Sequence, residues 1–416
     1  MATPKLRFKE FNDNWLKVDI QSLVDEKIID KPMDGNHGEI HPTSADYVED
    51  GIPFVMATDV IDGKVYLDKS KKIKKSQADG LRKGFSLEGD ILLTHKATIG
   101  NVAKVPELKT PYIMLTPQVT YYRVLNKDKL NQDFIKSTFE APVFQNALLA
   151  LCTGATRLYI GISEQRKLPF SYPSKKEQTK IASFLSAVDE KINQLTQKHQ
   201  LLSQYKQGMM QKLFSQQIRF KADDGSEFGE WDEYSLDTLL SKIIDNRGKT
   251  PVTEANLEIP LIEVNAIGQR RIKYEKVSKY FSEDTFQNWF RAYLEHQDIL
   301  FSTVGNTAIC SIYTDEIKAG IAQNIVGLRA NTKLIQPTFL YYLLTEISNN
   351  QKFKSIEMQA VQPSIKVSQM IHLTFLTPCL EEQTKIANFL SAIDQKIDVV
   401  SEQLEQAKLW KKGLLQ

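Results

Sequence analysis

A segment of sixteen residues occurs twice in this chain of 416 residues. Residues 177–192 read EQTKIASFLSAVDEKI and residues 382–397 read EQTKIANFLSAIDQKI, with thirteen identical positions at a constant offset of 205. A shared helical pattern would not by itself preserve polar residues such as Gln178/Gln383. The repeat therefore predicts two tandem copies of one module, each of about 205 residues.

Upstream of each repeated segment the two copies match only in short runs. LRFK before Trp15 is echoed by IRFK before Trp231, and DILLT at 90–94 is echoed by DILFS at 298–302. Pro117-Gln118-Val119 is echoed in the same way by Gln323-Asn324-Ile325. The apolar runs are kept where a core needs them, and the polar stretches between them differ. This pattern predicts one fold that carries two different surfaces.

Each repeated segment begins an apolar seam with alternating spacings of four and three residues. This spacing is typical of a coiled coil and predicts two long helices, within residues 173–216 and 378–416. The predicted seam consists of Ile181, Leu185, Val188, Ile192, Leu195, Leu202, Ile386, Leu390, Ile393, Ile397, Val400 and Leu404.

Two arrangements of these helices are compatible with the seam. The helices could cover each other, or each could be a core helix of its own domain. We favour mutual pairing, because a narrow seam without a wider apolar face suits a helical partner. Tandem copies related by a pseudo-two-fold axis would make the paired helices antiparallel.

The fold class predicted from these features is α+β. Two similar mixed domains, residues 1–172 and 217–377, would be joined and spaced by the two long helices, which form an antiparallel coiled coil with pseudo-two-fold symmetry. Inside the domains, the spacing of apolar residues predicts one helix over residues 131–151 and another over 338–353.

Charge excludes one class of nucleic-acid binder and leaves another open. The chain has 53 Lys and Arg against 51 Asp and Glu, a formal net charge of +2, which excludes a protein that binds through a basic tail. A local basic face is still compatible with this balance. The dense basic run between Lys69 and Lys83 is either a solvated face or a surface that contacts DNA phosphates.

Polar loop residues near these runs are of the types that pair with base edges, although they are also ordinary turn formers. The candidate DNA-binding residues are Lys71, Lys72, Lys74, Lys75, Arg82, Lys83, Thr94, His95, Lys96, Thr98, Asn101, Gln118, Arg157 and Tyr159 in the first domain, and Arg247, Lys249, Asn265, Arg270, Arg271, Ser302, Asn306, Gln323 and Asn324 in the second.

No catalytic residue or metal site is predicted. The phosphate loop GxxxxGK[ST], the dinucleotide motif GxGxxG and the nucleophile elbow GxSxG do not occur, and no two prolines are adjacent as in amino-methyltransferase motifs. His37 and His41 are close in sequence, but a solvated loop is a better interpretation than a zinc site. Three widely spaced cysteines indicate a reducing compartment, and we expect a cytoplasmic protein without a membrane segment.

Taken together, two variable domains that are each followed by a helix with EQxxIAxFLSxxDxKI resemble the specificity subunit of Type I restriction–modification systems. RFKEFNDNW at 7–15, RFKADDGSEFGEW at 219–231 and GDILLTHKATIGNVA at 89–103 are also typical of that family. The resemblance covers essentially the whole chain. It departs from the family pattern at Gln297, which stands where the first copy has Gly89.

The resemblance implies a DNA-binding subunit without catalytic activity. Each domain would read one half of an asymmetric bipartite DNA site, and the helices would set the spacing and bind two methyltransferase subunits. Those partners would carry S-adenosylmethionine, and separate translocase–nuclease subunits would use ATP and magnesium. The chain itself would need no cofactor. The alternatives are a self-sufficient nuclease or DNA methyltransferase with an unrecognised active site, and a coiled-coil assembly protein that does not bind DNA.

The matched polar residues of the two helices are candidates for docking the partner subunits, because the rest of the two copies was free to diverge. These candidates are Glu177, Gln178, Lys180, Asp189, Lys191, Glu382, Gln383, Lys385, Asp394 and Lys396.

Overall fold

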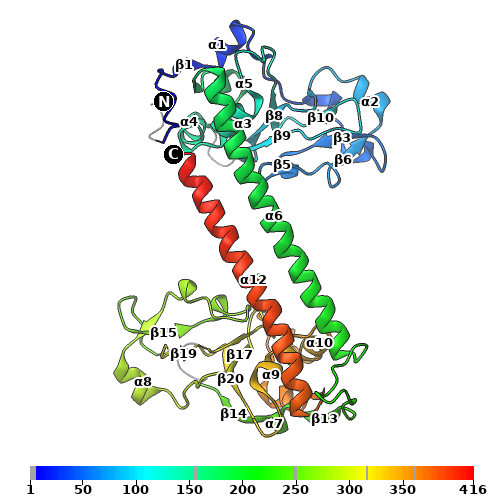
Figure 1. Cartoon of the computed structure of the whole chain (residues 1–416), viewed down its shortest axis with the longest axis vertical. Helices are drawn as coiled ribbons and strands as arrows, with labels where there is room; N and C mark the ends of the chain where they lie inside the picture. Colours follow the sequence, from blue (N-terminus) through cyan, green and yellow to red (C-terminus); the bar gives the residue numbers. More distant parts are fainter. Residues whose placement is uncertain (1–5, 154–157, 247–250, 315–316, 360) are drawn as a thin grey trace. The chain divides into compact units, whose positions relative to one another are not determined.

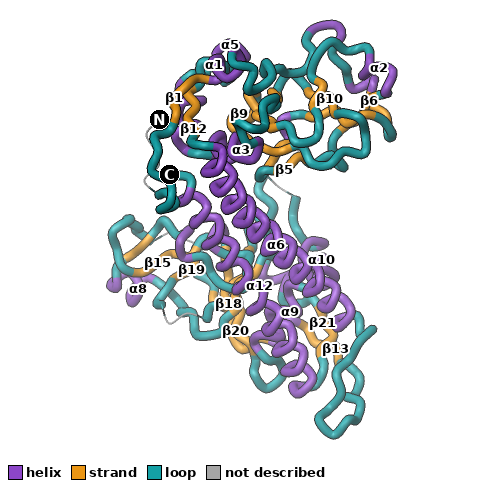
Figure 2. The backbone as a smooth tube through the Cα atoms, turned by 45° about the horizontal axis from the view of Figure 1, so that its top comes forward, coloured by secondary structure: helices purple, strands orange, loops and turns teal. Residues whose placement is uncertain are grey.

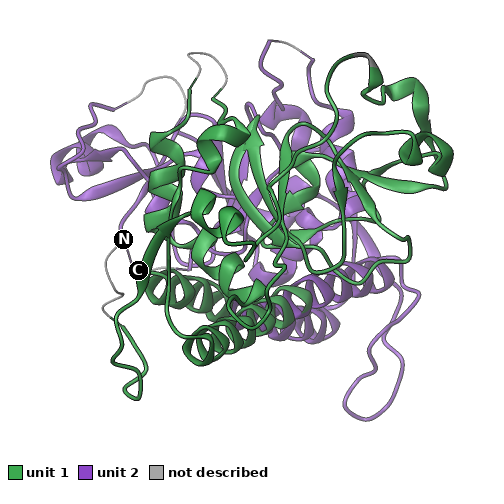
Figure 3. Cartoon of the chain, turned by 90° about the horizontal axis from the view of Figure 1, so that it is seen from above, with its two compact units in different colours: residues 1–197, 401–416 green, residues 198–400 purple. Residues whose placement is uncertain are grey.

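The computed structural model describes residues 6–153, 158–246, 251–314, 317–359 and 361–416. These residues form two compact units (Figure 3). Unit 1 contains residues 1–197 and 401–416, and unit 2 contains residues 198–400. Each unit therefore consists of one domain, the first part of the helix that follows it, and the last part of the other long helix.

Unit 1 is a mixed structure of short strands and helices (Figure 1). Its elements are β1 (Leu16–Asp19), α1 (Ile20–Asp25), β2 (Tyr47–Val48), β3 (Ile52–Val55), β4 (Val60–Ile61), β5 (Lys64–Val65), β6 (Lys71–Ile73), α2 (Lys75–Asp79), β7 (Phe85–Ser86), β8 (Ile91–Lys96), β9 (Thr98–Lys104), β10 (Ile113–Leu115), β11 (Val119–Tyr122), α3 (Gln132–Glu140), α4 (Pro142–Ala150), α5 (Ile162–Gln165), β12 (Pro169–Tyr172) and the first part of α6 (Lys175–Phe214).

Unit 2 is also a mixture of short strands and helices (Figure 2). Its elements are β13 (Asp232–Ser235), α7 (Leu236–Leu239), β14 (Leu240–Ile244), β15 (Ile259–Ile262), β16 (Tyr280–Phe281), α8 (Glu283–Trp289), β17 (Ile299–Ser302), β18 (Cys310–Ile312), β19 (Gly320–Ile321), β20 (Ile325–Ala330), α9 (Pro337–Thr345), α10 (Ile347–Ser355), α11 (Val367–Met370), β21 (Thr374–Thr377) and the first part of α12 (Leu380–Leu414).

The sheets of the two units have matching topologies. The antiparallel sheet β11–β8–β9 of unit 1 corresponds to β20–β17–β18 of unit 2, where β14 adds a fourth strand. A parallel pair, β3 with β10, recurs as β15 with β19, and the antiparallel pair β1 with β12 recurs as β13 with β21. The α+β fold of two similar domains with two long helices, which the repeat predicted, is confirmed.

Two of the predicted helices are each divided in two. The helix expected over 131–151 is α3 and α4, which meet at the extended residue Ala141 (ψ 139°). Proline disfavours a helical conformation in the residue before it, so Pro142 ends the first helix and begins the second. In unit 2 the break between α9 and α10 lies at Glu346, whose carboxylate accepts a hydrogen bond from the backbone N–H of Asn349.

The departure at Gln297 leaves the local turn unchanged. Gly89 has φ +84° and Gln297 has φ +69°, so both occupy the left-handed region. The backbone N–H of each donates to the residue that directly follows β9 or β18, Gly89 to the Val105 carbonyl and Gln297 to the Tyr313 carbonyl. Unit 2 thus keeps the turn with a residue for which this conformation is costlier than for glycine.

Inside each unit, the end of one long helix packs against the start of the other. In unit 1 the Trp410 ring of α12 lies 5.7 Å from the Phe184 ring of α6, and Lys411 pairs with Asp189. In unit 2 Lys206 of α6 pairs with Asp394 of α12. Leu213, further along α6, shares a core with Ile386, which lies earlier in α12, so the two segments run antiparallel.

The twelve predicted seam residues are all buried or half-buried. The seam does not serve helix pairing alone, because its first residues also complete the core of the preceding domain. Ile181 packs against the unit 1 core beside Phe134, and Ile386 and Leu390 lie in the unit 2 core with Phe339. Burial in a domain and pairing with the other helix, which the sequence analysis treated as alternatives, therefore occur together.

Candidate nucleic-acid interface

In unit 1, three loops meet at the end of strand β8. The backbone N–H of His95 donates to the Gln118 carbonyl at 2.9 Å, and the backbone N–H of Ile160 donates to the His95 carbonyl at 3.1 Å. Lys96 forms an antiparallel bridge with Tyr159. The turn before β11 and the loop before α5 are therefore fixed to the tip of the β8–β9 hairpin.

Unit 2 has the same frame with different residues. The backbone N–H of Thr303 donates to the Asn324 carbonyl at 2.9 Å, and the backbone N–H of Ile365 donates to the Thr303 carbonyl at 2.8 Å. Val304 forms a bridge with Ser364, as Lys96 does with Tyr159. Gln118 and Asn324 thus occupy equivalent positions, in agreement with the sequence echo around them.

A cleft of about 430 Å³ lies beside this frame in unit 1. The side chains that line it are mostly polar: His37, His41, Tyr47, Met56, Lys96, Thr116 and Gln118. The Thr116 hydroxyl is buried and has no hydrogen-bond partner among the described residues. A cleft with donors, acceptors and an unused buried hydroxyl is suited to a polar ligand such as a base edge.

A buried carboxylate organises the loop behind the cleft. Asp34 is 4% exposed; its carboxylate pairs with Lys83 and contacts His37 Nε2 at 2.8 Å. Burial alone would raise the pKa of Asp34, but these two contacts hold it below its ordinary value. The Asp34 carboxylate is therefore charged at neutral pH and fixes both basic side chains.

His95 lies under the same loop. Its Nδ1 contacts the Ile160 carbonyl at 3.0 Å, and its Nε2 lies 4.0 Å from the Asp34 carboxylate. Burial lowers the pKa of His95 despite the nearby carboxylate, so the imidazole is neutral at pH 7. We therefore assign His95 to supporting the loop.

The equivalent positions of unit 2 lack this polar cluster. Asn36 accepts a hydrogen bond from the Arg82 backbone N–H and donates to the Lys83 carbonyl. Asn246 does the same with Arg291 and Ala292, which aligns the two segments. The residues at the positions of Asp34, Lys83 and His95 are accordingly Ile244, Ala292 and Thr303.

The loop with His37 and His41 is exposed at His37, as a solvated loop would be, but both histidines also make contacts behind it. His37 binds a buried carboxylate, and His41 Nδ1 lies 3.1 Å from the Asn36 carbonyl. Nothing in one sequence links Asp34 to Lys83, which is 49 residues away, so this cluster was missed. No group of three or more His, Cys, Asp or Glu residues suited to a metal ion occurs in the described parts of the chain.

The predicted DNA-binding residues divide by exposure. The exposed ones are Lys71, Lys74, Lys75, Arg82, Lys96, Thr98, Tyr159, Asn265, Arg271, Asn306 and Gln323. The half-buried ones are Lys72, Lys83, Asn101, Gln118, Arg270 and Asn324. Arg157, Arg247 and Lys249 lie outside the described residues.

Three candidate DNA-binding residues, Thr94, His95 and Ser302, are buried, which corrects their selection as residues that contact DNA. The Thr94 hydroxyl accepts a hydrogen bond from the Asn101 backbone N–H at 2.9 Å. The Ser302 hydroxyl accepts one from the Ile309 backbone N–H at 3.0 Å, at the equivalent place in unit 2. These hydroxyls shape the hairpins and do not face solvent.

Five predicted docking residues, Glu177, Gln178, Glu382, Gln383 and Asp394, are also buried, so they do not form an exposed docking surface. Gln178 donates to the Lys129 and Pro173 carbonyls and accepts from the Asn131 backbone N–H. Gln383 makes the same three bonds, to Leu334, Pro378 and Gln336. The identity of these residues in the two copies therefore follows from identical contacts inside the units.

The charged docking candidates are mostly paired within their own unit. Asp189 lies 2.7 Å from Lys136 and from Lys411, and Asp394 lies 2.7 Å from Lys206. Lys180 pairs with Glu10, and Lys385 pairs with Asp223. Lys191 and Lys396 are exposed, as is Lys180.

Comparison with known families gives a match over both halves of the chain. A family model described as the Type I restriction modification DNA specificity domain matches residues 34–203 and again residues 229–409. The chain belongs to this family. Its two copies contain the two loop frames described above, one in each matched region.

Individual specificity subunits are similar over most of this chain. The MjaVIII specificity subunit of Methanocaldococcus jannaschii is 26% identical to this chain. The aligned region covers 69% of this chain and 66% of that relative's length. The EcoBI specificity subunit of Escherichia coli is 21% identical over 95% of this chain and 82% of its own length.

A solved structure shows the same fold. The Type I restriction–modification S subunit from M. genitalium aligns over 100% of this chain and 98% of its own, with a TM-score of 0.62 and 18% identity. No helix in the described residues combines the length and apolar character needed to cross a bilayer.

Proposed function

We propose that this chain is the DNA-recognition subunit of a Type I restriction–modification complex and that each unit reads one half of an asymmetric bipartite site. One observation carries the proposal. The units share a frame of backbone hydrogen bonds around β8 and β17, yet unit 1 carries Lys96 and Gln118 on this frame where unit 2 carries Val304 and Asn324. A shared frame with different polar groups supports the reading of two different sequences.

The residues around the unit 1 cleft are suited to direct readout. Lys96 is exposed at the cleft, and Gln118 lines it. Lysine side chains generally donate to the O6 and N7 acceptors of guanine, whereas the amide of glutamine pairs with adenine. In unit 2 Val304 stands in place of Lys96, and the polar groups nearby are the amides of Asn306, Gln323 and Asn324. We assign phosphate contacts to the exposed Lys71, Lys74 and Lys75 of β6, α2 and the turn between them, because such contacts position a protein without reading sequence.

Catalysis belongs to the partners in this proposal. Two methyltransferase subunits would bring S-adenosylmethionine, and translocase–nuclease subunits would bring ATP and magnesium, in the cytoplasm. Lys191 and Lys396 are at matching places on α6 and α12 and are exposed, so we place the methyltransferase contacts around them. The long helices would set the distance between the half-sites.

Mapping of methylated adenines in a host with and without this chain tests the proposal. The expected result is one asymmetric, interrupted site whose methylation disappears when the chain is deleted. Unchanged methylation would contradict it. Purified chain is assayed in parallel with duplex DNA, S-adenosylmethionine and magnesium, and cleavage or methylation by the chain alone would favour a self-sufficient enzyme.

A further inference from the structure

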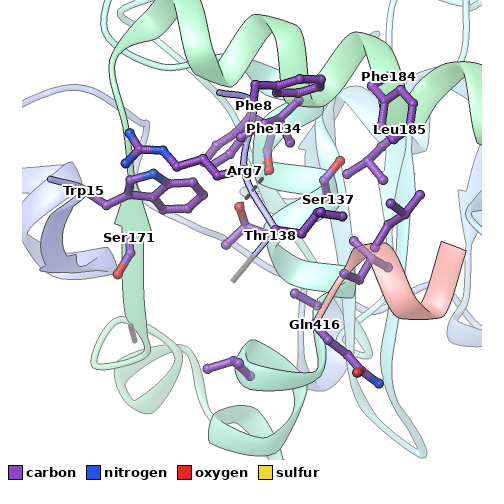
Figure 4. Close-up of a pocket in the computed structure, with 16 residues that line it drawn as sticks. Arg7, Phe8, Trp15, Phe134, Ser137, Thr138, Ser171, Phe184, Leu185 and Gln416 are labelled. Carbon is purple, nitrogen blue, oxygen red and sulfur yellow. Dashed lines mark hydrogen bonds between the residues drawn. The ribbon is translucent and has the colours of Figure 1, made fainter. Parts of the chain in front are cut away.

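Unit 1 contains two pockets of opposite chemistry. One is a largely apolar pocket of about 350 Å³, whose walls include Phe8, Trp15 and Phe134 (Figure 4). The other is the polar cleft of about 430 Å³ beside the tip of β8. The Thr116 hydroxyl in the wall of the polar cleft is buried without a hydrogen-bond partner among the described residues. Because buried polar groups in proteins are normally hydrogen-bonded, this hydroxyl points to a polar ligand in the cleft.

One of the two ring nitrogens of His37 is already bound to the protein. Its Nε2 lies 2.8 Å from the Asp34 carboxylate, which is 4% exposed and also pairs with Lys83. An ionised carboxylate only accepts hydrogen bonds, so Nε2 of His37 must carry the ring hydrogen. In the neutral imidazole the other nitrogen, Nδ1, is then an acceptor. His37 therefore offers an acceptor to the cleft that it lines.

The Gln118 side chain is bound through its opposite kind of group. Its Oε1 accepts a hydrogen bond from the Ala57 backbone N–H at 3.3 Å. Because a backbone N–H only donates, the amide oxygen is the end that faces Ala57 and the amide nitrogen is the end left for a ligand. Gln118 is half-buried and lines the same cleft. It therefore offers a donor where His37 offers an acceptor.

The second histidine of the cleft is less accessible. His41 is half-buried, and its ring lies 5.5 Å from the Phe54 ring. Its Nδ1 lies 3.1 Å from the Asn36 carbonyl. The His37 side chain, in contrast, is 56% exposed. A base edge can therefore reach the free ring nitrogen of His37, and we assign His41 to the wall of the cleft.

A donor and an acceptor in one cleft match the edge of adenine. In the major groove adenine presents the N7 acceptor and the N6 amine, whereas guanine presents acceptors only, cytosine a donor only and thymine an acceptor beside its methyl group. We propose that His37 is a specificity-determining residue of unit 1. Its Nδ1 accepts a hydrogen bond from the N6 amine of an adenine whose N7 accepts one from Gln118. This assignment rests on the proposed function, because it names the base that the cleft reads.

Asp34 is a positioning residue in this arrangement, because it contacts His37 and not the DNA. Its carboxylate fixes the ring hydrogen of His37 on Nε2, and Lys83 holds the carboxylate in place. Without the carboxylate the hydrogen is free to move to Nδ1, and that nitrogen would then donate where adenine also donates.

The first experiment removes single groups from the DNA. Competition binding is measured with the assembled complex at pH 8.5, because a protonated imidazole would donate from both nitrogens. In the half-site that changes when residues 1–172 are exchanged, each adenine except the methylated one is replaced by 2-aminopurine, which lacks the N6 amine, or by 7-deazaadenine, which lacks N7. We expect one adenine at which each replacement weakens binding roughly three- to tenfold, the effect of one lost hydrogen bond. A half-site without such an adenine would overturn the proposal.

The second experiment assigns each group of that adenine to a residue. In the His37→Phe complex 2-aminopurine should weaken binding no further, whereas 7-deazaadenine should still weaken it. Gln118→Met should show the reverse. Asp34→Asn should reduce the effect of 2-aminopurine and keep that of 7-deazaadenine, a split that a general loss of stability would not produce. Persistence of the full 2-aminopurine effect in His37→Phe would overturn the role of His37, and its persistence in Asp34→Asn would overturn the positioning role.

The half-site of unit 2 is the matched control. The same base replacements there should have effects that His37→Phe leaves unchanged, which also shows that the variant complex is folded. A natural complex that selects no bipartite site would contradict the proposed function itself. A complex that selects the bipartite site but responds equally to 2-aminopurine with and without His37 would contradict this inference alone.

Discussion

The Arg219 guanidinium donates two hydrogen bonds, of 3.1 and 2.7 Å, to the fully buried carboxylate of Glu382. Trp231 Nε1 donates a third bond to the same carboxylate at 3.2 Å. Arg7, Trp15 and Glu177 form the same cluster in unit 1. The two clusters join the N-terminal segment of each domain to the start of the helix after it.

Loss of this buried carboxylate should destabilise unit 2. Glu382→Ala leaves the Arg219 charge and the Trp231 N–H without their partner, so we expect a loss of about 3 kcal/mol in the free energy of unfolding. Thermal or urea unfolding of the full chain measures it. Lys396→Ala, an exposed change on the same helix, is the control and should cost less than about 0.5 kcal/mol. Equal effects of the two variants would refute the structural role of Glu382.

The Asp189 carboxylate should make the free energy of unfolding depend on pH. Burial alone would raise the pKa of Asp189, but Lys136 and Lys411 lower it below its ordinary value. A carboxylate with a lowered folded-state pKa contributes its full stabilisation above its unfolded value of about 3.9, and loses it as pH falls through the folded-state value.

The measurement is urea unfolding at pH 6 and pH 3 for the natural chain, Asp189→Asn and the exposed control Glu190→Gln. Asp189→Asn should reduce the drop in unfolding free energy between the two pH values, whereas Glu190→Gln should leave most of it. A drop that is unaffected by Asp189→Asn would contradict the pairing.

Replacement of Lys96 and replacement of Lys74 should affect the DNA sequence preference differently. Lys96→Ala removes a donor at the unit 1 cleft and should weaken binding of the cognate site by about 1–3 kcal/mol while relaxing one half-site. Lys74→Ala should weaken binding of all duplexes and lower the salt dependence without changing the preferred sequence. Competition binding with randomised half-sites, using the assembled complex, distinguishes the two. The assignment fails if Lys96→Ala alters the half-site of the other unit.

The long helices should act as a ruler. Deletion of one heptad from each helix, residues 196–202 and 401–407, removes about 10.5 Å of helix and should shorten the preferred gap between half-sites by roughly 3 base pairs. Methylation-site mapping with the shortened chain gives the gap directly. An unchanged gap in a folded, methylating complex would exclude the ruler.

The sequence predicted the architecture well because the repeat and the seam are strong, local signals. It failed where contacts join distant residues. The identity of Gln178 and Gln383 was attributed to docking, but both amides bind backbone groups nearly fifty residues away. The Asp34, Lys83 and His95 cluster was missed for the same reason, and the break at Ala141 shows that Pro142 outweighed a continuous apolar pattern.

The central claim is that each unit reads its own half of the DNA site. Replacement of residues 1–172 by the corresponding domain of a specificity subunit with a different known target, followed by mapping of methylated adenines, tests it most directly. The account predicts that one half of the site changes to that of the donor while the other half stays the same. A change in both halves, or in neither, would contradict it.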